Sequence, residues 1–260
     1  MIITKKLLYP AFTGEEERKL YIYLPKDYKK NTKKRYPVLY MFDGHNVFFD
    51  TDATYGKSWG LGDYLDRTKT PLIVVAIECH HGPNGERISE YSPYDFSEEL
   101  FGDVTGRGDE TMRYYIEELK PWVDRKYRTM PDREHTFLAG SSMGGLMALY
   151  GVFRYNDIFS KCAALSPSVF LCYKQMSDMV KNHTVARDTT IYMDMGTEEI
   201  ASGYEGGTAE GFAAFGNLMF QEGYPLTMRI IPGGAHCEAS WERQIPIFLP
   251  VLMHEIPEDN

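Results

Sequence analysis

Cysteine is scarce in this sequence, and the few residues present form no familiar ligand or disulfide pattern. Only 4 of the 260 residues are cysteine. They are Cys79, Cys162, Cys172 and Cys237. None belongs to a C-x-x-C motif, and three lie in or beside apolar, strand-like runs. We therefore interpret them as reduced packing residues and expect no disulfide, metal site or cofactor.

Long apolar runs and an excess of positive charge are also absent. No uninterrupted stretch is long enough to span a bilayer, and residues 1–10 lack the apolar core and cleavage site of a secretory signal. The formal net charge is −9, which argues against a nucleic-acid partner or an anionic membrane surface. We expect a cytoplasmic protein that binds neither, and a homo-oligomer stays open.

Repeats, low-complexity segments and linkers are missing too, which favours one domain over residues 1–260. Apolar strands alternate with helices, and this pattern predicts an α/β fold with a mostly parallel sheet and helices on both faces. Two N-terminal segments, 1–9 and 20–24, look like antiparallel strands. The further strands are expected at 36–42, 72–77, 136–138, 161–165, 190–195 and 226–231. The helices are expected at 59–67, 110–127 with a kink at Pro121, 146–153, 173–182, 208–221 and 238–254.

One short turn carries the main chemical signal. Gly140-x-Ser142-x-Gly144 lies between an apolar β-prone run and an almost continuously apolar helix. This is the context of a G-x-S-x-G nucleophile elbow, in which strand and helix nearly collide and glycine supplies the clearance. The sequence therefore predicts Ser142 as a nucleophile, with a Gly/Ser-rich loop as the alternative.

A nucleophilic serine needs a base, and the base needs an acid. Of the seven histidines, His236 lies in a short loop between the last predicted strand and the last helix. The acid is expected after the strand that ends near Met195. Glu199 fits a G-x-x-[DE] spacing there and is our first choice. Glu198 is the second choice, and Asp194 falls within the strand, where a structural role is expected.

The same turn suggests how a negative charge would be stabilised. The backbone N–H of Met143 follows the nucleophile and would supply one oxyanion donor. The second would come from Gly44 or His45, after the 36–42 strand. His80 and His81 follow Cys79, but no second ligand cluster appears at zinc-like spacing, so we interpret them as loop residues.

Residues 80–108 form a long stretch rich in Gly, Pro, Ser and Tyr, which predicts an irregular loop, with disorder as the alternative. Long loops inside a compact domain are commonly functional walls or lids. We expect this stretch to form part of an active-site wall or lid, with Tyr91 and Tyr94 in the substrate pocket. Trp59 and Trp241 are further candidates for the pocket, with plain core packing as the alternative.

With these residues in hand, the chain resembles the putative esterase family of α/β-hydrolases. This family includes enterochelin esterase-like enzymes, feruloyl and acetyl-xylan esterases, S-formylglutathione hydrolase and the mycolyltransferase relatives. The resemblance is carried by residues 40–46, 140–145 and 232–236 with Trp241. It implies Ser142 as nucleophile, His236 as base and Glu199 as acid. Several relatives carry aspartate at the acid position, so the pair Glu198-Glu199 departs from their pattern.

These observations predict an α/β-hydrolase fold and a metal-independent serine esterase. Its substrate would be a small or medium acyl ester, such as an acetylated sugar, a feruloyl ester or a siderophore ester. Two alternatives stay open. An acyltransferase could use the same Ser-His-acid set, or the chain could be a non-catalytic binding domain on a hydrolase scaffold.

Overall fold

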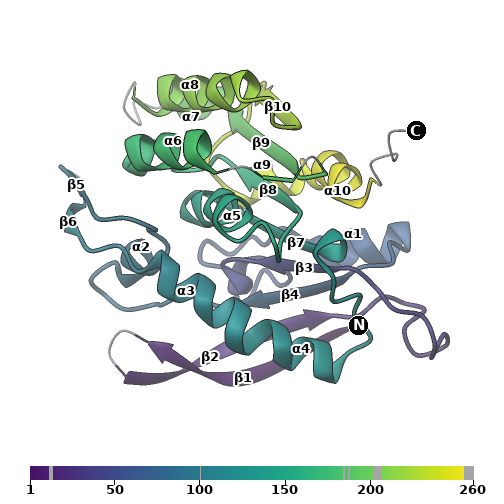
Figure 1. Cartoon of the computed structure of the whole chain (residues 1–260). Coiled ribbons are helices and arrows are strands. Elements are labelled where there is room, and N and C mark those ends of the chain that lie inside the picture. The colour runs from purple at the N-terminus through teal and green to yellow at the C-terminus, as the bar shows by residue number, and fades with distance from the viewer. Residues whose placement is uncertain (12–13, 100, 184, 187, 202–206, 255–260) are drawn as a thin grey trace.

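A computed structural model describes residues 1–11, 14–99, 101–183, 185–186, 188–201 and 207–254 (Figure 1). Within these residues, eight strands form one sheet in the order β1-β2-β4-β3-β7-β8-β9-β10. They are β1 (Ile2–Ala11), β2 (Gly14–Tyr23), β3 (Val38–Met41), β4 (Ile73–Ile77), β7 (Thr136–Ser141), β8 (Lys161–Leu165), β9 (Thr190–Gly196) and β10 (Leu226–Ile231). β2 pairs antiparallel with β1 and β4, and the remaining neighbours are parallel. The predicted α/β class is confirmed.

Helices cover both faces of this sheet. They are α1 (Leu61–Thr68), α2 (Glu86–Glu90), α3 (Gly108–Tyr114), α4 (Lys120–Lys126), α5 (Met143–Arg154), α6 (Tyr173–Asn182), α7 (Thr197–Ala201), α8 (Gly207–Gln221), α9 (Glu238–Glu242) and α10 (Ile245–Met253). Short 3₁₀ turns are η1 (Gly44–Asn46), η3 (Arg133–His135) and η4 (Val169–Cys172). α3, α5, α6 and α8 contribute to one hydrophobic core, whereas α1 and α10 contribute to the core on the opposite face.

Strand side chains alternate between these two cores, as the pleat requires. In β3, Val38 and Tyr40 enter the larger core, and Leu39 and Met41 enter the smaller one. All four are buried. This double burial explains why the parallel strands appear in the sequence as continuous apolar runs.

The helix predicted at 110–127 is present with one local change. α3 runs into a π-helical turn, η2 (Tyr115–Leu119), and then into α4. Pro121 stands in the first turn of α4. Proline lacks an N–H and its ring crowds the carbonyl four residues earlier. The wider π turn directly before it accommodates both effects.

The stretch 80–108 is more regular than predicted from its composition. It contains α2 and a two-stranded hairpin, β5 (Phe96–Glu98) with β6 (Gly102–Val104). The expectation of a wholly irregular loop was therefore wrong. Glycine and proline mark turns in the sequence, but they do not exclude short elements between the turns.

A buried ion pair fixes this stretch to the sheet. Arg18 on β2 donates two hydrogen bonds of 3.1 Å to the Glu90 carboxylate on α2, and both side chains are 1% exposed. Glu90 also accepts the backbone N–H of His80 at 3.0 Å. The pair thus holds both the start of the stretch and α2 in place.

None of the helices that the structure describes combines the length and the hydrophobicity that a membrane span needs.

We expect the Arg18–Glu90 pair to be costly to break. Glu90→Gln keeps the side-chain shape but leaves a buried guanidinium without its full counter-charge, so unfolding free energy should fall by about 3–5 kcal/mol. Asp178→Asn is the matched control, because its partner Lys174 and Asp178 are 85% and 52% exposed. That control should change stability by less than about 1 kcal/mol. Urea unfolding of both variants measures the difference, and equal losses would contradict the argument.

Candidate active site

Ser142 occupies the sharp turn between β7 and α5. Its backbone is at φ 58° and ψ −124°, a positive-φ conformation that non-glycine residues rarely adopt. Ser142 N–H donates to the Leu165 carbonyl at 2.9 Å, and its own carbonyl accepts N–H groups of Leu146 and Ser168 at 3.0 and 3.1 Å. These three bonds hold the strained residue in place. The turn has the geometry expected of a nucleophile elbow.

The glycines of the turn are required by close backbone approach. A Cβ added at Gly140 would lie 2.6 Å from the Gly144 backbone. One at Gly144 would lie 2.9 Å from the Phe42 side chain. Only glycine leaves enough space for strand and helix to meet here.

Glu199 and His236 come from loops after adjacent parallel strands. Glu199 lies in α7, directly after β9, and His236 lies between β10 and α9. Because β9 and β10 are parallel neighbours, both loops leave the same edge of the sheet. His236 Nδ1 and Glu199 Oε2 are 2.8 Å apart.

The Glu199 carboxylate is buried yet well satisfied. Its Oε1 accepts the Ser166 hydroxyl at 2.7 Å and the Gly196 N–H at 2.8 Å. Burial acts to raise the pKa of Glu199, but the hydrogen bonds from His236, Ser166 and Gly196 outweigh it and hold that pKa below its ordinary value. The group is therefore an anion at neutral pH.

Ser166 is a site residue that the sequence analysis missed. Its hydroxyl accepts Trp241 Nε1–H at 3.0 Å and donates to Glu199. It follows β8 with φ 45°. Its place directly after an apolar strand, in Leu165-Ser166-Pro167-Ser168, is the sequence signal that could have revealed it.

The structure distinguishes the three candidate carboxylates. Glu199 reaches His236, whereas Glu198 is exposed and its backbone N–H donates to the Gly234 carbonyl at 2.9 Å. Asp194 lies inside β9, where Tyr192 OH donates to it at 2.7 Å. Burial raises the pKa of Asp194 to about 7.

A cavity of about 770 Å³ opens beside the turn. Both Ser142 and His236 line it. The further lining residues include Asp43, His45, Asn46, Cys79, His81, Arg87, Met143, Ser168, Phe170, Leu171, Glu238 and Trp241. Ser142 Oγ lies 3.4 Å from Ser168 Oγ. Residues of the 80–108 stretch thus form part of the wall.

Of the four aromatic residues predicted for the pocket, only Trp241 lines this cavity. Tyr91 is buried and its OH accepts the Asp43 N–H at 3.2 Å. Tyr94 packs against Tyr150 at 5.9 Å between ring centroids. Trp59 is buried between Trp241 and Phe248. Tyr91 and Tyr94 therefore do not line this cavity, and Trp59 shows the core packing that was its alternative. An aromatic ring in the sequence does not tell which way its side chain turns.

The turn after β3 also contributes to the wall of the cavity. Met143 and His45 both line the cavity, whereas Gly44 packs against β4, where an added Cβ would meet the Ala76 backbone at 2.6 Å. Burial lowers the pKa of His45 to about 4, so its ring is neutral at pH 7.

An ion pair that the sequence analysis did not identify fixes this turn. Arg87 Nε and Nη2 donate to the two oxygens of Asp43 at 2.6 and 2.7 Å. Burial acts to raise the pKa of Asp43, but Arg87 overcomes it and keeps that pKa below its ordinary value. Asp43 directly precedes η1 and has φ 55°. The pair therefore connects the turn that carries His45 to α2.

The sequence matches a protein-family model described as "Putative esterase" over residues 13–246. One curated relative is Esterase Rv1288 of Mycobacterium tuberculosis, 30% identical over 145 residues. The match covers 56% of this chain and 28% of the relative, so this chain spans only part of that protein's length.

Two solved structures are similar over nearly the whole chain. An IroE-like serine hydrolase from Shewanella oneidensis aligns with TM-score 0.75 and 19% identity, covering 97% of this chain and 79% of the other. The siderophore hydrolase EstA from Aspergillus nidulans aligns with TM-score 0.74 and 16% identity, covering 96% and 95%. At these identities the likeness establishes a common fold.

The raised pKa of Asp194 predicts a specific pH dependence of stability. The unfolded value is about 3.9, so between about pH 4 and 7 the native state binds more protons than the unfolded state. The stability of the wild type relative to Asp194→Asn should therefore fall as pH rises through this range. Asparagine keeps an acceptor for Tyr192. Chemical unfolding of both proteins across the range measures the difference, and a constant difference would contradict the assignment.

Proposed function

The chain belongs to the Esterase family and is an ester hydrolase with the α/β-hydrolase fold, and from that premise we propose that Ser142, His236 and Glu199 form its catalytic triad. The observation that carries the proposal is the 2.8 Å contact between Glu199 and His236. It lies beside the cavity that Ser142 also lines. The chain order Ser, acid, His is that of α/β-hydrolases.

Glu199 sets the protonation state of the base. A carboxylate accepts hydrogen bonds, so its contact with Nδ1 favours the imidazole tautomer with the proton on that nitrogen. Nε2 then carries the lone pair that takes the Ser142 proton. The anionic carboxylate also stabilises the imidazolium that forms. Because three groups hold Glu199, it does not need to reorganise during the reaction.

Two backbone amides are suited to hold the oxyanion. Met143 is the first residue of α5, so its N–H lies at the helix N-terminus, where the helix dipole favours negative charge. The His45 N–H is the proposed second donor, because His45 lines the cavity and Gly44 packs against β4. The sequence left Gly44 and His45 open as the second oxyanion donor, and we propose His45.

The reaction then proceeds in two steps, acylation of Ser142 and hydrolysis of the acyl-enzyme. Ser142 Oγ attacks the ester carbonyl while His236 takes its proton, and the tetrahedral oxyanion collapses as His236 protonates the departing alcohol. Water attacks the acyl-enzyme in the same way, with His236 as base. Its proton returns to Ser142 Oγ as the free acid leaves.

We propose a small or medium acyl ester as the substrate. The cavity volume of about 770 Å³ falls in the range of small-ligand sites. Apolar Phe170 and Leu171 line it together with polar Arg87 and Glu238. This mixed wall suits feruloyl, siderophore or acetylated sugar esters, and a panel of such esters would separate them. Acyl transfer, a cytoplasmic location and the absence of nucleic-acid or membrane partners stay predictions from the sequence.

Ser142→Ala should abolish both turnover and covalent labelling by a fluorophosphonate. Loss of a triad nucleophile typically costs a factor of about 10⁶ in kcat. Ser168→Ala is the matched control, because its hydroxyl lies 3.4 Å from Ser142 Oγ. That variant should still be labelled. Mass spectrometry of the labelled peptide decides between the serines, and a folded wild-type protein without any label would favour the binding-domain alternative.

Replacing the two neighbouring glutamates tests the assignment of the acid. Glu199→Gln removes the negative charge opposite Nδ1 and should lower kcat by about 10²–10⁴. Glu198→Gln should leave kcat close to the wild-type value, because Glu198 is exposed. Steady-state kinetics with one chromogenic ester measures both variants. A larger loss in the Glu198 variant would reverse the assignment.

A further inference from the structure

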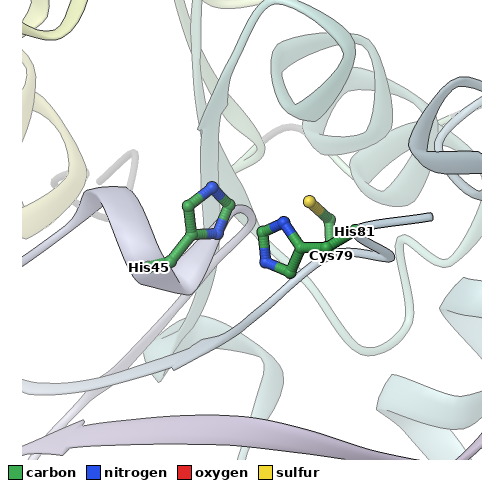
Figure 2. A group of neighbouring side chains, drawn as sticks. All are labelled: His45, Cys79 and His81. Atoms are coloured by element: carbon green, nitrogen blue, oxygen red, sulfur yellow. The ribbon is translucent and has the colours of Figure 1, made fainter. Parts of the chain in front are cut away.

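Two histidines and a cysteine from separate loops meet in the wall of the cavity. His45 lies in η1 after β3, whereas Cys79 and His81 follow β4. One potential ligand atom of each lies within 4.8 Å of the other two. Figure 2 shows the two imidazole rings close together, with the Cys79 sulfur beside His81. The rings are 4.5 Å apart between centroids.

The sheet explains why residues so far apart in sequence converge. β3 and β4 are parallel neighbours, so the turns after them leave the same edge. The sequence pattern Cys79-x-His81 alone lacks further ligands, which is why a metal site was not expected from it. The missing ligand, His45, is supplied by the neighbouring strand.

A buried nitrogen without a partner is the second observation. His45 is 5% exposed, and its Nδ1 has no hydrogen-bond partner within the described part of the chain. Its other nitrogen, Nε2, lies 3.0 Å from Thr54 Oγ1. If Nε2 donates to this hydroxyl, Nδ1 carries a lone pair. This is how outer partners orient metal-binding histidines.

We propose that His45, Cys79 and His81 bind a divalent transition-metal ion of the Zn²⁺ type. Two imidazoles and a thiolate are the donors that Zn²⁺ prefers. Tetrahedral Zn²⁺ with bonds of about 2.0–2.3 Å separates its ligand atoms by about 3.3–3.8 Å. The ligand atoms lie within 4.8 Å of one another, so small side-chain movements bring them to these separations, and the exposed His81 is the freest of the three to move.

Binding is balanced by the release of one proton. The metal–sulfur bond replaces the S–H bond of Cys79, and the proton leaves to water. The nearby Arg87 is paired with Asp43, so its charge is offset. Three protein ligands leave a fourth position for water or a polar substrate atom. All three ligands line the cavity, which places that position on the cavity side.

Co²⁺ titration of the purified wild-type protein tests the site without any ester substrate. Co²⁺ replaces Zn²⁺ with similar ligands and reports on them by absorption. We expect one equivalent to give a thiolate-to-cobalt charge-transfer band together with visible bands of tetrahedral intensity. Zn²⁺ should then remove these bands. Since activity is not the readout, a failed result here leaves the triad proposal untouched.

Matched variants assign the ligands. Cys79→Ala should remove the charge-transfer band, whereas Cys237→Ser, at the partly exposed cysteine, should keep it. His81→Gln should weaken Co²⁺ binding by at least about 100-fold. This loss exceeds the one usually seen when a residue that only hydrogen-bonds a metal ligand is replaced. His80→Gln is its control, because His80 Nδ1 already accepts the Gly82 N–H at 2.8 Å. It should bind Co²⁺ like the wild type.

Thermal unfolding gives a second readout that also reports whether each variant is folded. Zn²⁺ should raise the Tm of the wild type and of His80→Gln equally, and should raise that of His81→Gln much less at the same concentration. The proposal is overturned if the wild type binds no Co²⁺, or if the charge-transfer band survives in Cys79→Ala. It is equally overturned if His81→Gln binds as tightly as His80→Gln.

Discussion

The buried carboxylate of Glu199 is the constraint around which the cavity end of the sheet is built. A charge taken out of water is tolerable only when hydrogen bonds replace its hydration. Three donors do this, and they come from Ser166 after β8, Gly196 at the end of β9 and His236 after β10. The requirement to satisfy one carboxylate therefore brings three loops together and sets the direction of the imidazole.

Two further buried carboxylates, those of Asp43 and Glu90, also need partners that replace their hydration. Asp43 is paired with Arg87 and Glu90 with Arg18, and each pair is largely buried. The first pair attaches α2 to the turn after β3 and the second attaches it to β2, so the residues around α2 form a wall with a defined shape. Ser142 lies between these two groups of ion-paired and hydrogen-bonded residues. Backbone hydrogen bonds with Leu165, Leu146 and Ser168 hold it in its strained conformation.

The two proposals concern one cavity. The serine and histidine of the proposed triad lie on the side formed by α5 and the β10 loop, and the His45, Cys79 and His81 cluster lies on the side formed by the β3 and β4 loops. His45 belongs to both arguments: its backbone is proposed to face the oxyanion, and its ring carries the unpartnered nitrogen. A bound ion would add positive charge to the cavity that Ser142 and His236 also line.

The sequence by itself determined the sheet strands, most helix positions and the Gly140–Gly144 turn, because periodicity, glycine spacing and strand ends are local signals. The chain order also predicts that Ser142 pairs with His236, and this pairing stays a proposal. The sequence also ranked Glu199 above Glu198. Only the tertiary structure decided which carboxylate reaches the imidazole, that Trp59, Tyr91 and Tyr94 face the core, and that His45 meets Cys79 and His81. Those outcomes depend on which strands are neighbours and on which way a side chain turns. Neither is encoded within any single short segment of the chain.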